Sequence, residues 1–188
     1  MRAVVLGLLA LAVTAAPAAA QPPPMPVRTI AVAEFENISV DSGIIPAAVL
    51  SDLLAQLLQR QRAPVRVVAG AAVRAALRAR GYTPADLIYP SRAAEVAQAV
   101  GAEWLVTGRW TQLRTISRSV PEDPTSPSVR GGDGLAVADV EVRVMEAPGR
   151  RRVFEGRFSG RAVGADSGAL YLAAYQALQG AAAAIGRL

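Results

Sequence analysis

The sequence contains no histidine, no cysteine and no lysine, so it lacks the side chains that supply most nucleophiles, neutral-pH bases and soft metal ligands. A Ser–His–Asp triad, a Cys–His pair, a serine–lysine dyad and a phosphate loop with its lysine are therefore excluded. All 20 basic residues are arginine, which stays protonated and so pairs and anchors instead of transferring protons. These absences predict a binding protein, not an enzyme, and they indicate no cofactor and no metal site.

The high isoelectric point of 10.6 overstates the positive charge of the chain. Nothing titrates between the carboxylates and the arginines when histidine and lysine are absent, and the formal net charge is only +5. The one arginine run, Arg150-Arg151-Arg152, follows Pro148-Gly149 and is typical of a solvated hairpin turn, the alternative being a contact with an acidic surface. We therefore expect no nucleic-acid partner.

Residues 1–20 have the pattern of a secretory signal peptide. A charged start at Arg2 precedes a 14-residue apolar run and the small residues Ala18-Ala19-Ala20, which predict cleavage after Ala20. The run is shorter than the ~20 residues that span a bilayer, although an uncleaved membrane anchor is the alternative. We expect an exported, periplasmic protein with no membrane span after cleavage. No cysteine follows the run to carry a lipid anchor.

Residues 21–26 (QPPPMP) predict a short extended spacer, because consecutive prolines hold polyproline geometry. The following 27–188 suit one domain in length, and such a domain can bury enough apolar surface to fold without disulfides. Two amphipathic helical patterns, at 50–58 and 73–80, are each followed by a breaker, Pro64 and Gly81. Ser91 is expected to cap a third helix that ends at Gly101, and Asp166 or Ser167 a last one that runs to about residue 185.

Strand patterns lie between these helices. Apolar or β-branched stretches at 27–35, 65–68 and 102–113 predict three strands, and the alternation at 138–144 and 154–162 around Pro148-Gly149 predicts a hairpin. The proline- and glycine-rich segment 118–134 predicts a loop. The order β-α-β-α-α-β-β-β-α indicates an α/β (α+β) fold: a mixed sheet of about five strands packed by helices, partly parallel with an antiparallel hairpin.

Three segments resemble one superfamily, in the same order. They are 30–37 (IAVAEFEN), 101–108 (GAEWLVTG) and the hairpin 144–160. This superfamily includes the TolB amino-terminal domain, the curli secretion protein CsgG and the LpoB-like lipoprotein activators of penicillin-binding proteins. The resemblance covers roughly 27–188 and implies a stand-alone periplasmic domain that binds cell-envelope proteins. The chain departs from the pattern because it lacks the anchoring cysteine, and because the broken segment 118–134 does not suit a membrane-spanning hairpin.

We therefore expect a non-catalytic periplasmic adaptor that acts on a cell-envelope assembly. The alternative, which the resemblance to CsgG implies, is a self-associating structural subunit, a homo-oligomer, of an envelope or secretion complex. A third hypothesis, a polysaccharide hydrolase, rests on Glu34 and Glu36, which would share a face of an extended strand. No second acidic cluster completes such a site, so a turn or surface role is expected for the pair.

The candidate partner-binding residues are aromatic residues and arginines in connecting segments, because these types dominate binding hot spots. This set consists of Tyr82, Tyr89, Arg114, Arg118 and Arg130. Trp104 and Trp110 are six apart in a predicted strand, so they share one face, and we expect that face to be the core under a helix.

Overall fold

The computed structural model describes residues 27–39, 45–61, 65–117 and 134–188. The predicted leader, the proline-rich spacer and nearly all of the predicted loop 118–134 lie outside the described residues. Within the described residues, six strands form one sheet that is packed by four α-helices, with one 3-10 helix. The elements are β1 (Arg28–Val32), β2 (Glu36–Asn37), α1 (Ala47–Gln59), β3 (Val65–Val68), α2 (Gly70–Arg80), η1 (Pro84–Ile88), α3 (Pro90–Ala99), β4 (Trp104–Ser117), β5 (Gly134–Glu146), β6 (Arg151–Val163) and α4 (Ser167–Ile185).

The sheet is mixed, as the order of elements predicts. Its strands run β3-β1-β4-β5-β6, and β2 pairs with β4 beside that path. β1 is parallel to both β3 and β4, because helices connect these strands, whereas β4, β5 and β6 are successive antiparallel neighbours. The predicted fold class is confirmed, including the antiparallel hairpin around Pro148-Gly149.

Three details differ from the sequence-based expectation. The first predicted strand, 27–35, is shorter in the structure, where β1 ends at Val32, and a separate two-residue strand, β2, follows the predicted range, so the sheet has six strands. The connector before α3 contains η1, which a capping box between Thr83 and Asp86 stabilises. α3 begins at Pro90, one residue before the expected cap Ser91, because proline needs no backbone N–H at the start of a helix.

The predicted helix ends at Gly81 and Gly101 are confirmed, since both glycines have φ of +66°.

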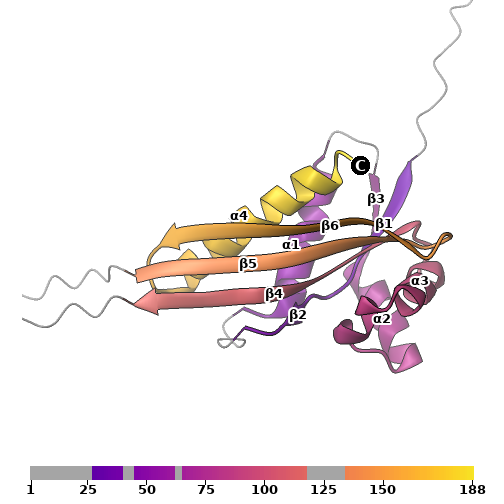
Figure 1. Cartoon of the computed structure of the whole chain (residues 1–188), viewed down its shortest axis with the longest axis horizontal. Helices are drawn as coiled ribbons and strands as arrows, with labels where there is room; N and C mark the ends of the chain where they lie inside the picture. Colours follow the sequence, from indigo (N-terminus) through magenta and orange to yellow (C-terminus); the bar gives the residue numbers. More distant parts are fainter. Residues whose placement is uncertain (1–26, 40–44, 62–64, 118–133) are drawn as a thin grey trace, which may run out of the picture.

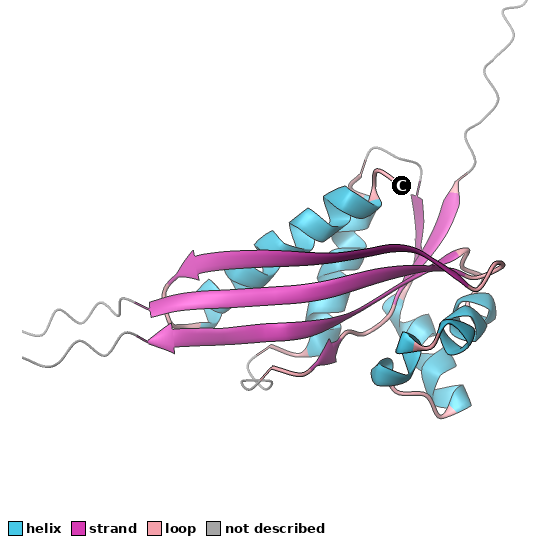
Figure 2. Ribbon diagram, in the orientation of Figure 1, coloured by secondary structure: helices cyan, strands magenta, loops and turns pink. Residues whose placement is uncertain are grey.

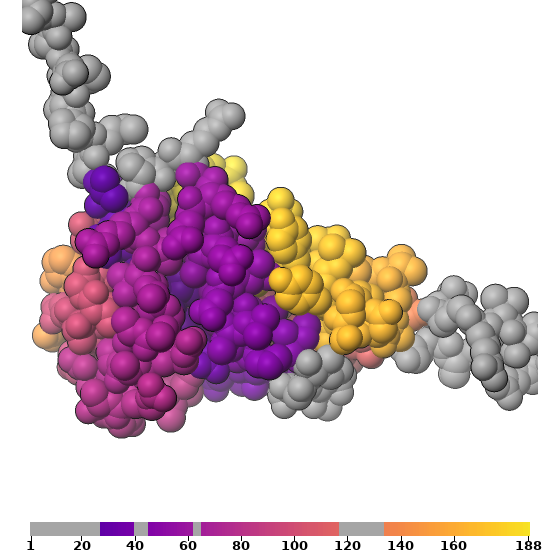
Figure 3. All heavy atoms as spheres, turned by 180° about the vertical axis from the view of Figure 1, so that it is seen from behind, coloured from indigo at the N-terminus to yellow at the C-terminus, as the bar shows by residue number. Residues whose placement is uncertain are grey.

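β4, β5 and β6 form a long three-stranded ribbon that extends well past the short strands β1 and β3 (Figure 1). Each ribbon strand has 13 or 14 residues, against five and four in β1 and β3. One face of the ribbon, here called the inner face, is covered by α1 and α4, as Figure 2 and the rear view in Figure 3 show. Among the described residues, the helices cover the opposite or outer face only at its base, where α2 and α3 pack on Leu105 and Met145.

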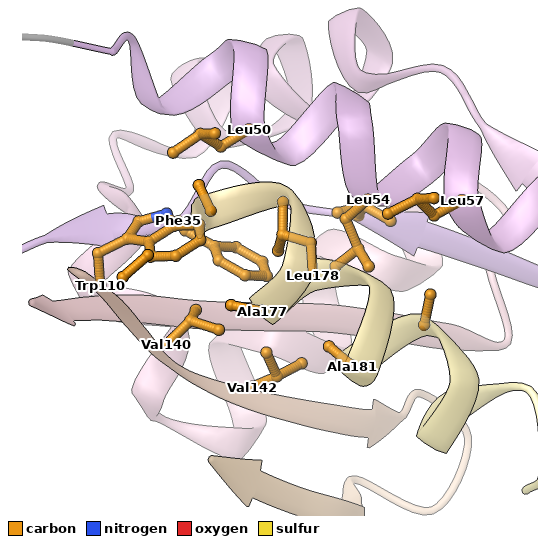
Figure 4. Close-up of a cluster of buried hydrophobic side chains, with 14 of the residues drawn as sticks. Phe35, Leu50, Leu54, Leu57, Trp110, Val140, Val142, Ala177, Leu178 and Ala181 are labelled. Atoms are coloured by element: carbon orange, nitrogen blue, oxygen red, sulfur yellow. The ribbon is translucent and has the colours of Figure 1, made fainter. Parts of the chain in front are cut away.

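The main core lies between the inner face, α1 and α4 (Figure 4). Both tryptophans belong to this core, so the prediction for Trp104 and Trp110 is confirmed. The indole N–H of Trp110 has no hydrogen-bond partner within the described residues, so packing alone holds that ring, with Phe35 6.4 Å away. Ser51 connects α1 to the strand layer, because its hydroxyl accepts the backbone N–H of Phe35 and donates to the carbonyl of Ala47.

α4 lies directly against β6 because small residues face one another there. The buried residues of α4 include four alanines in helical spacing, Ala173, Ala177, Ala181 and Ala174. Opposite them is Gly160 of β6, where an added Cβ would overlap the carbonyl oxygen of Ala173 and lie 3.0 Å from the backbone nitrogen of Ala177. The side chain of Asp166 caps α4 by accepting the N–H of Ala169, as predicted.

We expect Gly160→Ala to lower the free energy of unfolding by about 1–3 kcal/mol, because the new methyl group can be accommodated only if α4 moves away from β6. Urea unfolding followed by circular dichroism measures this change. The matched control is Gly168→Ala at an exposed position in the first turn of α4, where the Cβ makes an ordinary 3.4 Å contact and the change should be about 0.5 kcal/mol or less. Equal effects of the two substitutions would contradict the close packing.

Candidate functional site

The outer face of the ribbon beyond η1 is the one broad face of the sheet that none of the described helices covers (Figure 1). Because strand residues alternate between faces, Val140 and Val142 point to the core while Asp139, Glu141 and Arg143 point outward. The antiparallel register aligns the outward residues of β4, β5 and β6 in rows that cross the strands. The candidate site is built from these rows.

The central row alternates in charge over four strands. Register places Glu36 of β2, Arg109 of β4, Glu141 of β5 and Arg157 of β6 side by side. The Nε of Arg109 lies 2.7 Å from one carboxylate oxygen of Glu141, and Nη2 of Arg157 lies 2.7 Å from the other. Glu141 is therefore held by two guanidinium groups, one from each neighbouring strand.

The rows on either side have further ion pairs. Toward the base, Arg143 and Glu155 are paired at 2.8 Å. Toward the tip, Asp139 pairs with Arg161 at 2.8 Å, and the next row consists of Arg114, Val137 and Arg161. These pairs fix the charged side chains of adjacent strands relative to one another.

Two hollows lie on this outer face, and both include Glu141 in their lining. A small one of about 20 Å³ lies between η1 and the charged row, where Leu87 and Ile88 meet Arg109. A broader, shallow groove of about 370 Å³ lies over the middle of the ribbon and is lined by Thr111, Asp139, Glu141, Arg157 and Ser159 among others. The β-bulge at Thr111, which shifts the register between Trp110 and Gln112, lies at the edge of this groove.

The ion pairs set the charge of the central carboxylate. The hydrogen bond from Arg109 lowers the pKa of Glu141, and the positive charges of Arg109 and Arg157 lower it further, against the opposing effect of burial. Glu141 is therefore ionised at neutral pH and is not available as a proton donor. The arrangement suits recognition of charge instead of acid–base catalysis.

The predicted partner-binding residues do not form one cluster. Tyr82 and Tyr89 both lie near the guanidinium of Arg92, at 5.3 and 5.1 Å, beside η1 and α3. The hydroxyl of Tyr82 donates to Glu95, while Tyr89 is exposed. Arg114 lies apart from them, exposed on the outer face in the distal half of β4. The other two candidates, Arg118 and Arg130, lie outside the described residues.

Glu34 and Glu36, on which the hydrolase hypothesis rests, lie in different local structures. Glu36 belongs to β2 and faces Arg109, whereas Glu34 precedes that strand. Within the part of the chain that the structure describes, no three acidic residues gather to form a candidate metal site.

Arg109, Glu141 and Arg157 were not among the residues selected from the sequence. Alternation at 138–144 places Glu141 on the outward side, and this was visible in the sequence. That Glu141 is buried between two arginines depends on the register of β4 and β6 against β5, which the pattern within one strand does not specify.

None of the helices in the described part of the chain combines the length and the apolar character that a bilayer crossing requires.

Comparison with known proteins identifies the fold. No family model and no curated protein matches the sequence. Among solved structures, a lipoprotein of Neisseria meningitidis (GNA1162) has 18% identity and a TM-score of 0.54, covering 85% of this chain and 96% of its own. The hypothetical protein CT253 of Chlamydia trachomatis has 13% identity and a TM-score of 0.51, covering 86% and 96% respectively. A weaker similarity, with 14% identity and a TM-score of 0.49, covers 85% of this chain and 82% of LpoB from Escherichia coli. At the level of the fold, the similarity to the lipoprotein GNA1162 confirms the predicted resemblance.

We expect Glu141→Gln to lower the free energy of unfolding at pH 7 by about 1–3 kcal/mol, because two charged hydrogen bonds are weakened. The pKa of Glu141 is lowered in the folded state, so its stabilising contribution is present above its ordinary pKa and is lost as the pH falls through the lower folded value. The difference from the parent protein should therefore shrink between pH 7 and pH 3 in urea unfolding. The exposed Glu103→Gln serves as the control; a Glu141→Gln deficit that persists unchanged at pH 3 would contradict the charged role.

Proposed function

We propose that this chain is a non-catalytic adaptor of the cell envelope that docks on another envelope protein through the outer face of its ribbon. The observation that carries the proposal is the uncovered outer face itself, on which arginines from two strands flank the buried carboxylate of Glu141. A surface that is rigid, charged and broad suits a macromolecular partner better than a small substrate, which favours an enclosed pocket.

Two features of the sequence support a periplasmic location and a non-catalytic role for this chain. The pattern of residues 1–20 supports export to the periplasm. The absence of histidine, cysteine and lysine, together with the ion pairing of the outward carboxylates, supports binding without catalysis. The fold is shared with a lipoprotein of Neisseria meningitidis, which agrees with an envelope location.

A second candidate is the self-associating structural subunit. It is favoured by an apolar row at the tip of the outer face, where Ile116, Leu135 and Val163 lie side by side and are exposed. Exposed apolar side chains on adjacent strands are a common element of protein interfaces. In this candidate function the row would contact a second copy of the chain.

In-cell photo-cross-linking separates the two candidates. A photoreactive residue at Gln112, on the outer face, should cross-link to a different envelope protein, and mass spectrometry of the product identifies it. The same residue at Gln179, exposed on α4, is the control and should give no such product. Self-cross-links alone from Gln112 would favour the structural subunit, and equal products from both positions would contradict docking through the ribbon.

A further inference from the structure

The outer face contains two arginine pairs that flank β5, and only the first has a carboxylate of the chain directly between its two arginines. In the second pair, Arg161 bonds Asp139 in the neighbouring row. In the first clamp, Arg109 and Arg157 flank Glu141. In the second clamp, Arg114 and Arg161 occupy the same positions on β4 and β6, but the residue between them on β5 is Val137. We propose that the second clamp binds a carboxylate from an extended acidic segment of the partner protein, and that Arg157 of the first clamp binds another. This inference rests on the adaptor function and specifies the chemistry of its partner.

The geometry of the clamps follows from the sheet. β4 and β6 lie on opposite sides of β5, so the two arginines of one clamp start from backbones about 10 Å apart, at about 4.8 Å per strand. Val137 and Glu141 are four residues apart, which separates the clamps by about 13 Å at about 3.3 Å per residue. An extended peptide has the same rise, so acidic side chains at positions i and i+4 match the two clamps.

The arginines of the outer face are more exposed than the carboxylates between them, and this favours an anionic partner. The carboxylates lie low in the surface, where the side chains of Glu141 and Asp139 are 8% and 23% exposed. The arginines rise above them, with 83% exposure for Arg157 and 45% for Arg161. The four clamp arginines exceed Glu141, Asp139 and Glu36, the carboxylates beside them, by one positive charge, and an approaching molecule meets the exposed guanidinium groups first.

Stabilising the outward carboxylates of β5 requires fewer arginines than the outer face contains. Arg109 alone satisfies one oxygen of Glu141, and Arg161 alone pairs with Asp139. Arg114 makes no ion pair with any of the described residues, yet it stands exposed beside Val137. The guanidinium of Arg161 is already engaged, because it donates to both carboxylate oxygens of Asp139 and to the carbonyl oxygen of Gly160. The exposed guanidinium groups of Arg114 and Arg157 therefore supply the capacity for a bidentate bond to a partner's carboxylate. The shallow groove of about 370 Å³ lies between the clamps, where an extended segment would pass.

The test uses a fluorescent 12-residue serine peptide with two glutamates at positions i and i+4, called the spaced peptide, and a second peptide of the same composition with the two glutamates adjacent. Fluorescence anisotropy with the purified protein should show binding of the spaced peptide that is at least tenfold tighter than binding of the adjacent peptide, because only the spaced pair matches the ~13 Å between the clamps. Arg114→Gln combined with Arg157→Gln should weaken this binding at least tenfold, since both residues are exposed and Glu141 keeps Arg109. The matched control combines Arg66→Gln with Arg78→Gln on β3 and α2, which removes the same charge elsewhere and should change binding less than twofold.

A substitution that fills the second clamp gives an independent test. Val137→Glu places a carboxylate of the chain between Arg114 and Arg161, so it should abolish peptide binding, whereas Val137→Gln should retain it. Should Val137→Glu fail to fold, the arginine double variant still decides the outcome.

Several results would overturn the inference. These are equal binding of the two peptides, no binding of either, equal loss in the test and control variants, or displacement of the peptide by phosphatidylglycerol vesicles. The adaptor function is tested separately by the cross-link from Gln112. An envelope protein captured there through a segment without acidic residues would preserve the adaptor and refute the acidic partner.

Discussion

The structure depends on the antiparallel register that joins β4, β5 and β6 over their full length. Since side chains alternate along a strand on either side of the bulge at Thr111, the register decides both faces at once. It aligns Ala138, Val140 and Val142 toward α1 and α4, and by the same step it aligns Glu141 between Arg109 and Arg157 on the other side. A slip by one residue would bury the charges in the core, so the core itself maintains the arrangement of the candidate site.

The inner face also explains why so much of the ribbon is stable without a helix on its outer side. α4 approaches β6 closely because glycine and alanine meet there, and α1 adds leucines to the same core. On the outer face the ion pairs connect adjacent strands, and Glu141 is shared by two of them. Charged side chains on β6, the edge strand, further disfavour pairing with the edge of another sheet. The uncovered face is thus a stable surface on which a partner can dock.

Much of the fold could be predicted from the sequence because periodicity and breakers are local signals. The leucine spacing of α1, the left-handed Gly81 and Gly101, and the alternation around Pro148-Gly149 identified elements that the structure confirms. The two-residue β2 and the short η1 were not predicted, because neither is long enough to show the sequence periodicity of a strand or a helix. The candidate site was predictable only in part. Arg114 was selected as an arginine in a connecting segment, whereas it lies within β4, which runs past the predicted end at residue 113. The buried Glu141 and its two arginines result from pairing between strands far apart in the sequence.

Because the chain contains no cysteine, a single serine-to-cysteine substitution places a unique reactive group at a chosen surface position. Ser159 lies on the outer face at the groove and Ser91 lies exposed on α3. The most direct measurement is the rate of maleimide labelling of Ser159→Cys in native cells, compared with the purified protein and with Ser91→Cys. A partner on the outer face should slow labelling of Ser159→Cys in cells and leave Ser91→Cys unchanged. Equal labelling rates of Ser159→Cys in cells and in the purified protein would contradict docking through the outer face of the ribbon.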